Sequence, residues 1–221
     1  MRCLVTAGPT FEPLDEVRRL TNFSTGRLGC GLAAALTAAG HEVCLLLSEQ
    51  AIVPPPELPR SEIQRFTSTQ SLREQLAARA GGAIEAVFHA AAVSDFTFGR
   101  IYRRLPDGTT QEVRGAKIES RGAPLLAELV PTPKLLPLLR DWFPRAIIIG
   151  WKYELEGTTE EALAKARRQL EEARSHACVL NGRAYGPGFA LVTSQRPPQH
   201  CRDQQALCAS LLQLLAERAP G

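Results

Sequence analysis

The stretch Thr21–Gly29 carries the most concentrated set of groups in this chain that could do chemistry. It reads T-N-F-S-T-G-R-L-G, which combines the amide of Asn22 with hydroxyls, an arginine and two glycines. A helical pattern begins within this stretch, and a helix N-terminus attracts negative charge through its free N–H groups and its dipole. We therefore expect these residues to bind a phosphorylated substrate and its reacting carboxylate, with the anion near Ser24, Thr25 and Gly26.

Other polar residues have an ordinary structural interpretation beside the functional one. Asp95 follows the apolar run Ala86–Ala91, and ligands of doubly wound sheets bind at the ends of such strands, although the position also suits a surface turn. Lys117 lies in a charged segment, where local evidence favours a surface charge. Asn22 taken alone suits a structural role in a turn before a helix. Together with its neighbours and Arg18, a functional role for Asn22 becomes as well supported as the structural one.

Apolar runs of strand length alternate with helical patterns, which predicts an α/β fold with a doubly wound, mostly parallel Rossmann-like sheet. Strands are expected at residues 2–6, 42–47, 63–66, 86–91, 146–151, 177–181 and 189–193. Helices are expected at residues 26–39, 71–79, 134–141, 158–173 and 204–217. The pairs Ser71/Glu74 and Thr158/Glu161 fit capping boxes, and Gly40 fits the C′ position of the first helix.

Two connections depart from this regular pattern. A loop of about 20 residues after the first strand is longer than most β-to-α connections, and we interpret it as functional. Residues 96–113 are charged and have a turn at Pro106–Gly108, which predicts a β-hairpin, and an extended segment follows, so that the flap covers about 96–130. A proline-rich connection with prolines at 54–56 and 59 crosses the surface. We expect a single domain over residues 1–221, with the flap as an insertion.

Composition restricts the partners and the compartment. The chain has 221 residues, of which 44% are hydrophobic, and a net charge of +3 that is too small to indicate a nucleic-acid or membrane surface. No apolar run approaches the ~18 residues of a membrane span, and no signal peptide is evident. The six cysteines form no C-x-x-C pair, so we expect a reducing cytoplasm.

Several common site motifs are absent. The glycines read Gly26-x-x-Gly29-x-Gly31, which is not the G-x-G-x-x-G fingerprint of dinucleotide-binding turns. No tyrosine has a lysine four residues later, and no G-x-x-x-x-G-K-[ST] loop or G-x-S-x-G elbow occurs. The four histidines lack metal-ligand spacing. An NAD(P)-dependent oxidoreductase of Rossmann-like fold is the alternative that these observations disfavour but leave open.

Taken in order, the motifs resemble those of the phosphopantothenate–cysteine ligase family, also called phosphopantothenoylcysteine synthetases. The matching segments are residues 5–10, 17–18, 21–29, 90–95, 117–118, 130–136, 150–152, 181 and 188–189. They cover essentially the whole chain, and the ordered set is specific although each segment is short.

The resemblance implies a reaction. This family joins 4′-phosphopantothenate to L-cysteine in coenzyme A synthesis and uses a nucleoside triphosphate, CTP or ATP, with Mg²⁺. The substrate carboxylate attacks the α-phosphorus to give an acyl-nucleotidyl anhydride and pyrophosphate, and the cysteine amine then displaces the nucleotide. We expect a stand-alone synthetase without the flavin decarboxylase domain, hence no FMN, and a homodimer with flap strands exchanged or packed at its interface.

The resemblance also implies residue roles. Asn22 would hold the acyl-nucleotidyl intermediate through its amide, and Lys117 would neutralise charge during acyl transfer, which makes these two the expected catalytic residues. The expected substrate contacts are Arg18, Ser24, Thr25, Gly26 and Ala92. The expected nucleotide contacts are Gly8, Asp95, Lys117, Pro133, Lys134, Leu135, Leu136, Trp151 and Lys152. No residue is assigned to a metal.

The chain departs from many bacterial members in two places. These members continue the flap lysine as K-x-K-K, whereas this chain reads Lys117-Ile118-Glu119-Ser120, closer to the eukaryotic style. Gln169 and Ala173 stand where bacterial members place helix lysines. These departures leave the choice between CTP and ATP open, and the reduced flap lysines keep a non-catalytic nucleotide-binding relative as a further alternative.

Overall fold

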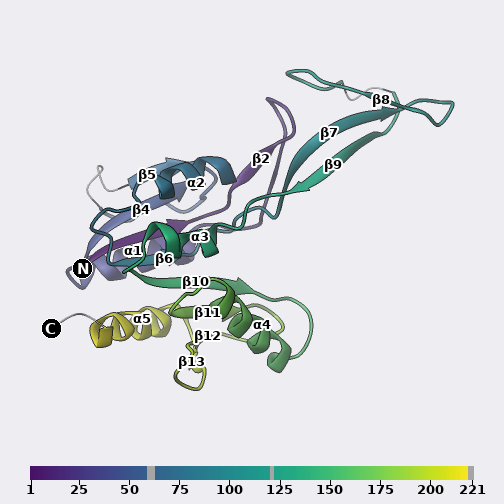
Figure 1. The fold of residues 1–221 in the computed structure, drawn as a ribbon. Coiled ribbons are helices and arrows are strands. Elements are labelled where there is room, and N and C mark those ends of the chain that lie inside the picture. Colours follow the sequence, from purple (N-terminus) through teal and green to yellow (C-terminus); the bar gives the residue numbers. More distant parts are fainter. Residues whose placement is uncertain (59–62, 120–121, 219–221) are drawn as a thin grey trace.

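Five apolar runs form parallel strands, as expected for strands that are covered on both faces, and the more polar segment 63–66 adds a sixth parallel strand at the edge. In the computed structural model, which describes residues 1–58, 63–119 and 122–218, they build the centre of an eight-stranded sheet (Figure 1). The parallel strands are β1 (Arg2–Ala7), β4 (Glu42–Ser48), β5 (Ile63–Phe66), β6 (Ala86–His89), β10 (Ile147–Tyr153) and β11 (Ala177–Asn181). The antiparallel strands β12 (Phe189–Val192) and β13 (Gln199–Cys201) extend the β11 edge. The predicted mostly parallel sheet is confirmed.

The order of the strands reverses at β1. The parallel part of the sheet runs β5-β4-β1-β6-β10-β11, so β1 pairs with β4 on one side and with β6 on the other. This is the doubly wound order of dinucleotide-binding sheets, in which ligands bind outside the carboxyl ends of the strands where the order reverses. The fold therefore directs attention to the residues that follow β1 and β6.

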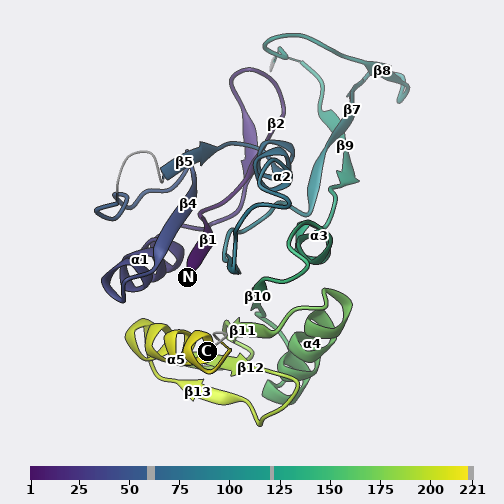
Figure 2. The same ribbon diagram turned by 60° about the vertical axis from the view of Figure 1, so that its left-hand side comes forward.

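Helices cover both faces of the sheet (Figure 2). They are α1 (Arg27–Ala38), α2 (Thr69–Ala77), α3 (Leu135–Trp142), α4 (Thr159–Glu172) and α5 (Gln204–Arg218). Successive strand residues point to opposite faces, so Val5 and Phe88 pack in the core with α1 and α5, and Leu4 and Val87 in the core with α2 and α3. A third core joins α4 to β11 and β12. Among the described residues, no helix is both long enough and apolar enough to cross a bilayer.

The cysteines contribute to these cores as thiols. All six are buried and none forms a disulfide. Burial raises the pKa of Cys3 and of Cys178 to about 12, so both side chains are uncharged small hydrophobic groups at neutral pH.

Two of the predicted helix signals are confirmed and one is wrong. Gly40 has a φ of +82° after α1, and Thr158 forms the predicted capping box with Glu161. The predicted box that starts at Ser71 is wrong, because α2 begins earlier: Ser68 is its N-cap, and the Ser68 side chain accepts a hydrogen bond from the Ser71 N–H at 3.2 Å.

The long connection after β1 is a β-hairpin and not an irregular loop. Its strands are β2 (Phe11–Pro13) and β3 (Arg19–Thr21), and they pair antiparallel. The carboxylate of Glu12 is buried and accepts a hydrogen bond at 3.0 Å from the backbone N–H of Thr69, the first residue of α2. The hairpin is therefore fixed to the body of the protein on one side.

The predicted flap is confirmed as an antiparallel sheet of three strands that projects from the body (Figure 1). Its strands are β7 (Phe96–Arg104), β8 (Thr110–Glu112) and β9 (Leu125–Pro131), in the order β8-β7-β9. The turn between β7 and β8 is closed by a hydrogen bond from the Leu105 N–H to the Thr109 carbonyl at 2.8 Å. Pro59 and Ser120, named in the sequence predictions, lie outside the described residues.

Helix α1 lies so close to β1 that position 29 has no room for a side chain. A Cβ atom on Gly29 would lie 2.5 Å from the Cβ of Ala7 and 3.1 Å from the Thr6 carbonyl oxygen. On the same helix, a Cβ on Gly31 would meet only the side chain of Gln204, which can move.

We predict that Gly29→Ala destabilises the protein by about 1–3 kcal/mol, because the added methyl group overpacks a rigid strand. Gly31→Ala is the matched control, since it adds the same methyl group to the same helix against a movable side chain. Urea unfolding measures both. Equal stability of the two variants would contradict the predicted close packing.

Candidate active site at the strand reversal

The loops that follow β1 and β6 are joined by backbone hydrogen bonds. The Ala92 N–H donates to the Gly8 carbonyl at 3.0 Å, and the Thr10 N–H donates to the Ala92 carbonyl at 3.1 Å. The Ser94 N–H also donates to the Thr10 hydroxyl at 2.8 Å. These bonds make a fixed floor at the point where the strand order reverses.

Asn22 lies on this floor. It follows β3 directly, and its side-chain nitrogen donates to the carbonyls of Ala92 and Val93 at 3.3 and 3.2 Å. The Asn22 side chain is exposed, and both hydrogen bonds are long. The structure thus brings Asn22 and Ala92 together, as predicted, with an amide that a ligand in this place can reach.

A glycine-lined cradle lies beside Asn22. Gly8 and Gly26 have φ values of +87° and +79°, and a Cβ on Gly26 would lie 3.5 Å from the Gly8 Cα. Gly26 is the N-cap of α1 and offers no side chain, and the first intrahelical bond runs from the Cys30 N–H to the Gly26 carbonyl. The N–H groups of residues 27–29 therefore have no partner within the helix, an arrangement that binds anions.

These glycines repeat the three roles of a dinucleotide-binding turn without its sequence spacing. Gly8 makes the turn after β1, Gly26 opens the helix, and Gly29 lets the helix pack on the strand. The hairpin and its flanks, residues 9–25, stand between the first two of them. Sequence spacing could not show this, because the hairpin separates glycines that are neighbours in space.

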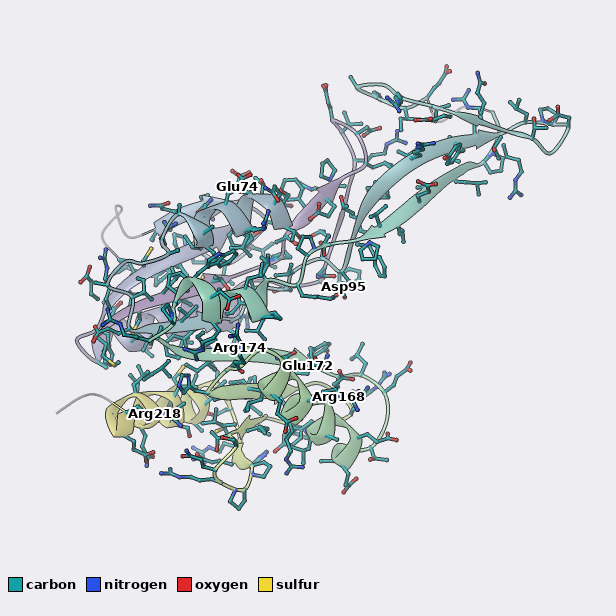
Figure 3. The ribbon with its side chains drawn as sticks, viewed as in Figure 1. Glu74, Asp95, Arg168, Glu172, Arg174 and Arg218 are labelled. Atoms are coloured by element: carbon teal, nitrogen blue, oxygen red, sulfur yellow. The ribbon has the colours of Figure 1, made fainter. Side chains whose placement is uncertain are left out.

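Asp95 lies at the neck between the body and the flap (Figure 3) and forms an ion pair with Lys134. Both side chains are about two-thirds exposed, 67% for Asp95 and 68% for Lys134. Exposed ion pairs contribute little to stability, so both groups are available to a charged ligand at small cost. Lys134 is also the N-cap of α3, which it leaves without a side-chain cap.

The remaining predicted nucleotide residues do not all face one space. Pro133 is exposed, whereas the side chain of Leu135 is buried in the core of α2 and α3, so only its backbone could touch a ligand. Leu136 packs over Gly150, where a Cβ would lie 2.7 Å from a Leu136 methyl carbon. Trp151 and Lys152 are consecutive in β10, so their side chains leave opposite faces of the sheet.

The two polar side-chain groups at the end of β10, the indole of Trp151 and the ammonium of Lys152, differ in their contacts. The indole Nε1 of Trp151 is buried and has no hydrogen-bond partner among the described residues. Lys152 pairs with Glu154 at 3.3 Å, and Lys165 of α4 pairs with the same carboxylate at 2.6 Å. Burial acts to raise the pKa of Glu154, and the two lysines together outweigh it, so the pKa lies below its ordinary value.

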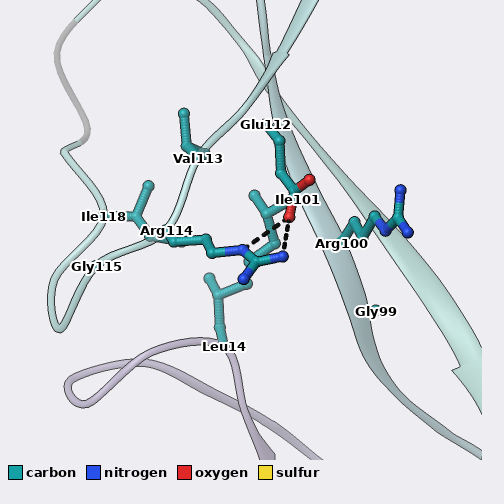
Figure 4. Close-up of a pocket in the computed structure, with 9 residues that line it drawn as sticks. All are labelled: Leu14, Gly99, Arg100, Ile101, Glu112, Val113, Arg114, Gly115 and Ile118. Atoms are coloured by element: carbon teal, nitrogen blue, oxygen red, sulfur yellow. Dashed lines mark hydrogen bonds and ion pairs between the residues drawn. The ribbon is translucent and has the colours of Figure 1, made fainter.

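Arg18 and Lys117 lie where the hairpin meets the flap. Arg18 donates to Asp15 and to the Ile118 carbonyl, and Lys117 is exposed beside an open cavity of about 360 Å³. A second cavity of about 290 Å³ lies nearby between Leu14 and the flap (Figure 4). Within the described residues no hydrogen bond or ion pair links Lys117 to Asn22.

Comparison with known proteins identifies the family of this chain. The family model described as the C-terminal domain of DNA/pantothenate metabolism flavoproteins matches residues 1–195. Human phosphopantothenate–cysteine ligase is 30% identical over 246 residues, which cover 87% of this chain and 75% of the human protein. The chain belongs to the phosphopantothenate–cysteine ligase family.

Other relatives and solved structures agree with this family assignment. The coenzyme A biosynthesis bifunctional protein of Thermococcus kodakarensis is 33% identical over 180 residues, and the chain spans only 41% of its length. The crystal structure of the DNA/pantothenate metabolism flavoprotein from Streptococcus pneumoniae matches with a TM-score of 0.85 at 27% identity, covering 99% of this chain and all of that one. A Cab2 variant in complex with phosphopantothenate-cysteine shares the fold, with a TM-score of 0.72 at 20% identity, covering 98% and 85% of the two chains.

In this member of the ligase family, the floor of the site also rests on a histidine that the sequence predictions did not single out. His89 ends β6 and is buried, and its Nδ1 hydrogen-bonds the Thr6 hydroxyl at 3.0 Å. The same hydroxyl accepts a bond at 3.1 Å from the Ala91 N–H, just ahead of Ala92. Burial lowers the pKa of His89 to about 4, so the ring is neutral at physiological pH. Its position directly before Ala90–Ala92 was the signal available in the sequence.

We predict that His89 makes stability depend on pH below neutrality. Its folded pKa lies below the unfolded value of about 6.5, so the unfolded state binds more protons in this range. The contribution of neutral His89 to the free energy of unfolding is complete above pH 6.5 and is lost as the pH falls towards 4. At pH 5 the loss is about 2 kcal/mol. Urea unfolding at pH 7.5 and 5.0 measures this, and His89→Gln should show a smaller acid loss. An identical loss in wild type and variant would contradict it.

Proposed function

We propose that this chain catalyses the family reaction, joining 4′-phosphopantothenate to L-cysteine through an acyl-nucleotidyl intermediate. The observation that carries the proposal is the placement of the Asn22 amide on the Ala92 and Val93 carbonyls, next to the glycine cradle at the start of α1. The resemblance assigns the activated acyl group to this asparagine. The names of its relatives, among them the human and mouse phosphopantothenate–cysteine ligases, support the same reaction.

The chemistry has two steps. A carboxylate oxygen of phosphopantothenate attacks the α-phosphorus of the nucleotide, and the bond from that phosphorus to pyrophosphate breaks. The cysteine amine then attacks the acyl carbon, the nucleoside monophosphate leaves with the electrons of the anhydride bond, and the amine loses a proton. Activation is needed because a carboxylate is a poor acyl donor and an acyl phosphate is a good one.

In this proposal the hairpin side of the site binds the acyl substrate. Asn22 exchanges one of its two long hydrogen bonds to the Ala92 and Val93 carbonyls for one to the acyl-nucleotidyl group, and Ala92 is small enough to let the backbone approach that group. Ser24, Thr25 and Gly26 lie at the N-terminus of α1, where hydroxyls and free N–H groups suit an anionic group. Arg18 keeps donor capacity in Nη1, since its hydrogen bonds to the described residues use Nε and Nη2.

The nucleotide is proposed to lie between the Gly8 turn and the neck of the flap. Asp95, Lys134 and the backbone of residues 133–136 would meet it on one side. One of Trp151 and Lys152, whose side chains leave opposite faces of the sheet, would meet it at the end of β10. Within the described residues, no group of three or more His, Cys, Asp or Glu side chains could hold a metal ion. That fits Mg²⁺ carried by the nucleotide phosphates with one or two carboxylates, of which Asp95 is the candidate, and the ion would neutralise phosphate charge.

A homodimer is also proposed. Four large apolar side chains of the flap are exposed in the single chain: Phe96, Leu126, Leu129 and Val130. They lie on β7 and β9, so a second copy packed along the flap would remove apolar surface from water. Sedimentation at assay concentration tests this proposal, and a chain that stays monomeric while fully active would refute it.

The reaction itself is tested by pyrophosphate release. We expect release that requires phosphopantothenate, measured side by side with CTP and with ATP in the presence of Mg²⁺, and we expect one nucleotide to be preferred. No release with either nucleotide would refute a ligase function. Tight nucleotide binding without release would identify a non-catalytic relative, and quenching of reduced nicotinamide fluorescence would identify the oxidoreductase alternative.

The residue roles are tested by two substitutions that keep size and fold. Asn22→Asp and Lys117→Gln should each lower amide formation by about 100- to 1,000-fold, the usual loss when one preorganised charge-stabilising donor is removed. Arg114→Gln is the control, since Arg114 is an exposed flap cation that pairs with Glu112. Full amide formation by Lys117→Gln would show that the flap charge has no part in acyl transfer.

A further inference from the structure

The backbone of Ile118, next to the flap lysine, has both of its hydrogen-bonding groups occupied by side chains of the hairpin. The Ile118 N–H donates to Asp15 Oδ2 at 3.1 Å, and the Ile118 carbonyl accepts from Arg18 Nη2 at 2.6 Å. Asp15 and Arg18 also bind each other. The Asp15–Arg18 pair therefore binds both backbone groups of Ile118, which lies 103 positions along the chain from Asp15.

Asp15 is saturated by this arrangement. Oδ1 accepts from the backbone N–H groups of Val17 and Arg18 at 3.1 and 2.8 Å, and Oδ2 accepts from the Arg18 guanidinium and from Ile118. The side chain has no solvent exposure. Its bond to Arg18 is the main cause that holds the pKa of Asp15 far below the ordinary value, so the carboxylate stays charged throughout the physiological range.

Two further contacts strengthen the junction. The Glu16 N–H donates to the Ala116 carbonyl at 3.0 Å, and the buried side chain of Ile118 lines the same cavity as Leu14 (Figure 4). The turn of the hairpin is thus bound to residues 116–118 at several points. Lys117 lies between the two bound residues of this segment, and Asn22 follows the hairpin directly after β3.

We infer that Asp15 is a positioning residue, which uses Arg18 and the Ile118 backbone to fix the flap lysine Lys117 relative to the hairpin that carries Asn22. This inference rests on the proposed function for the part that concerns acyl transfer. Its physical basis is that a buried, charged acceptor gives strong hydrogen bonds to its donors. Removing that charge frees the 116–118 segment and leaves Arg18 without its partner.

The test compares Asp15→Asn with Glu112→Gln, which removes the same charge from a flap residue whose carboxylate pairs with Arg114. Hydrogen exchange of the full-length chain should show lost protection at the Glu16 and Ile118 N–H groups, which donate to Ala116 and Asp15, in Asp15→Asn alone. Amide formation should fall by about 10- to 100-fold, because small misplacements of a catalytic group have effects of this size. Formation of the acyl nucleotide and pyrophosphate should change by less than threefold.

The outcomes separate this inference from the proposed function. Unchanged exchange at Ile118 in Asp15→Asn would overturn the positioning role of Asp15. An equal loss of protection in Glu112→Gln would overturn it too. If Asp15→Asn does not fold, hydrogen exchange of the wild-type protein still tests the inference. An Ile118 N–H that exchanges as fast as the N–H groups of the exposed β7–β8 turn would refute the positioning role of Asp15. Absence of pyrophosphate release by the wild-type chain would instead refute the ligase function. The exchange result would then test only whether Asp15 holds residues 116–118 in place.

Discussion

The site depends on the hydrogen bonds of one carbonyl group, that of Ala92. It accepts from the Thr10 N–H, which joins the loops after β1 and β6, and from the side-chain amide of Asn22. The framework and the expected catalytic residue therefore share an acceptor at the point where the strand order reverses. A shift of the loop after β6 would move both at once, so the sheet sets the position of the amide directly.

The hairpin between β1 and α1 is held by two buried carboxylates that act on opposite sides. Glu12 accepts a backbone N–H from Thr69 at the start of α2, and Asp15 accepts one from Ile118 in the flap. Hydrogen bonds to charged groups are stronger than those between neutral groups. A short hairpin with exposed strands thus obtains a defined place between body and flap without an apolar core of its own.

Much of the fold could be predicted from sequence because parallel strands read as continuous apolar runs, as β1, β4 and β6 do. The β2–β3 hairpin could not, since strands of three residues are too short to show an alternating pattern, and the one buried side chain of the two strands is the charged Glu12. The start of α2 was misplaced because Ser68 and Ser71 both suit a cap, and tertiary contacts chose between them.

The same limit applies to the candidate site. Asn22 was recognisable because its partners in the motif are adjacent in sequence, and Asp95 because it follows a buried strand. Asp15 and His89 were not, since their roles come from Ile118 and Thr6, residues far away along the chain. Leu135 shows the opposite case, in which a motif position proves to be a core side chain.

The separation of Gly8 from Gly26 has a consequence for how such proteins can diversify. The two glycines lie side by side, so residues 9–25 leave the body of the protein and return to it at the same place. The intervening segment can change in length and composition while the start of α1, the proposed anion site, keeps its place. Exchange of this hairpin could thus alter the choice of acyl substrate with no change in the sheet that supports it.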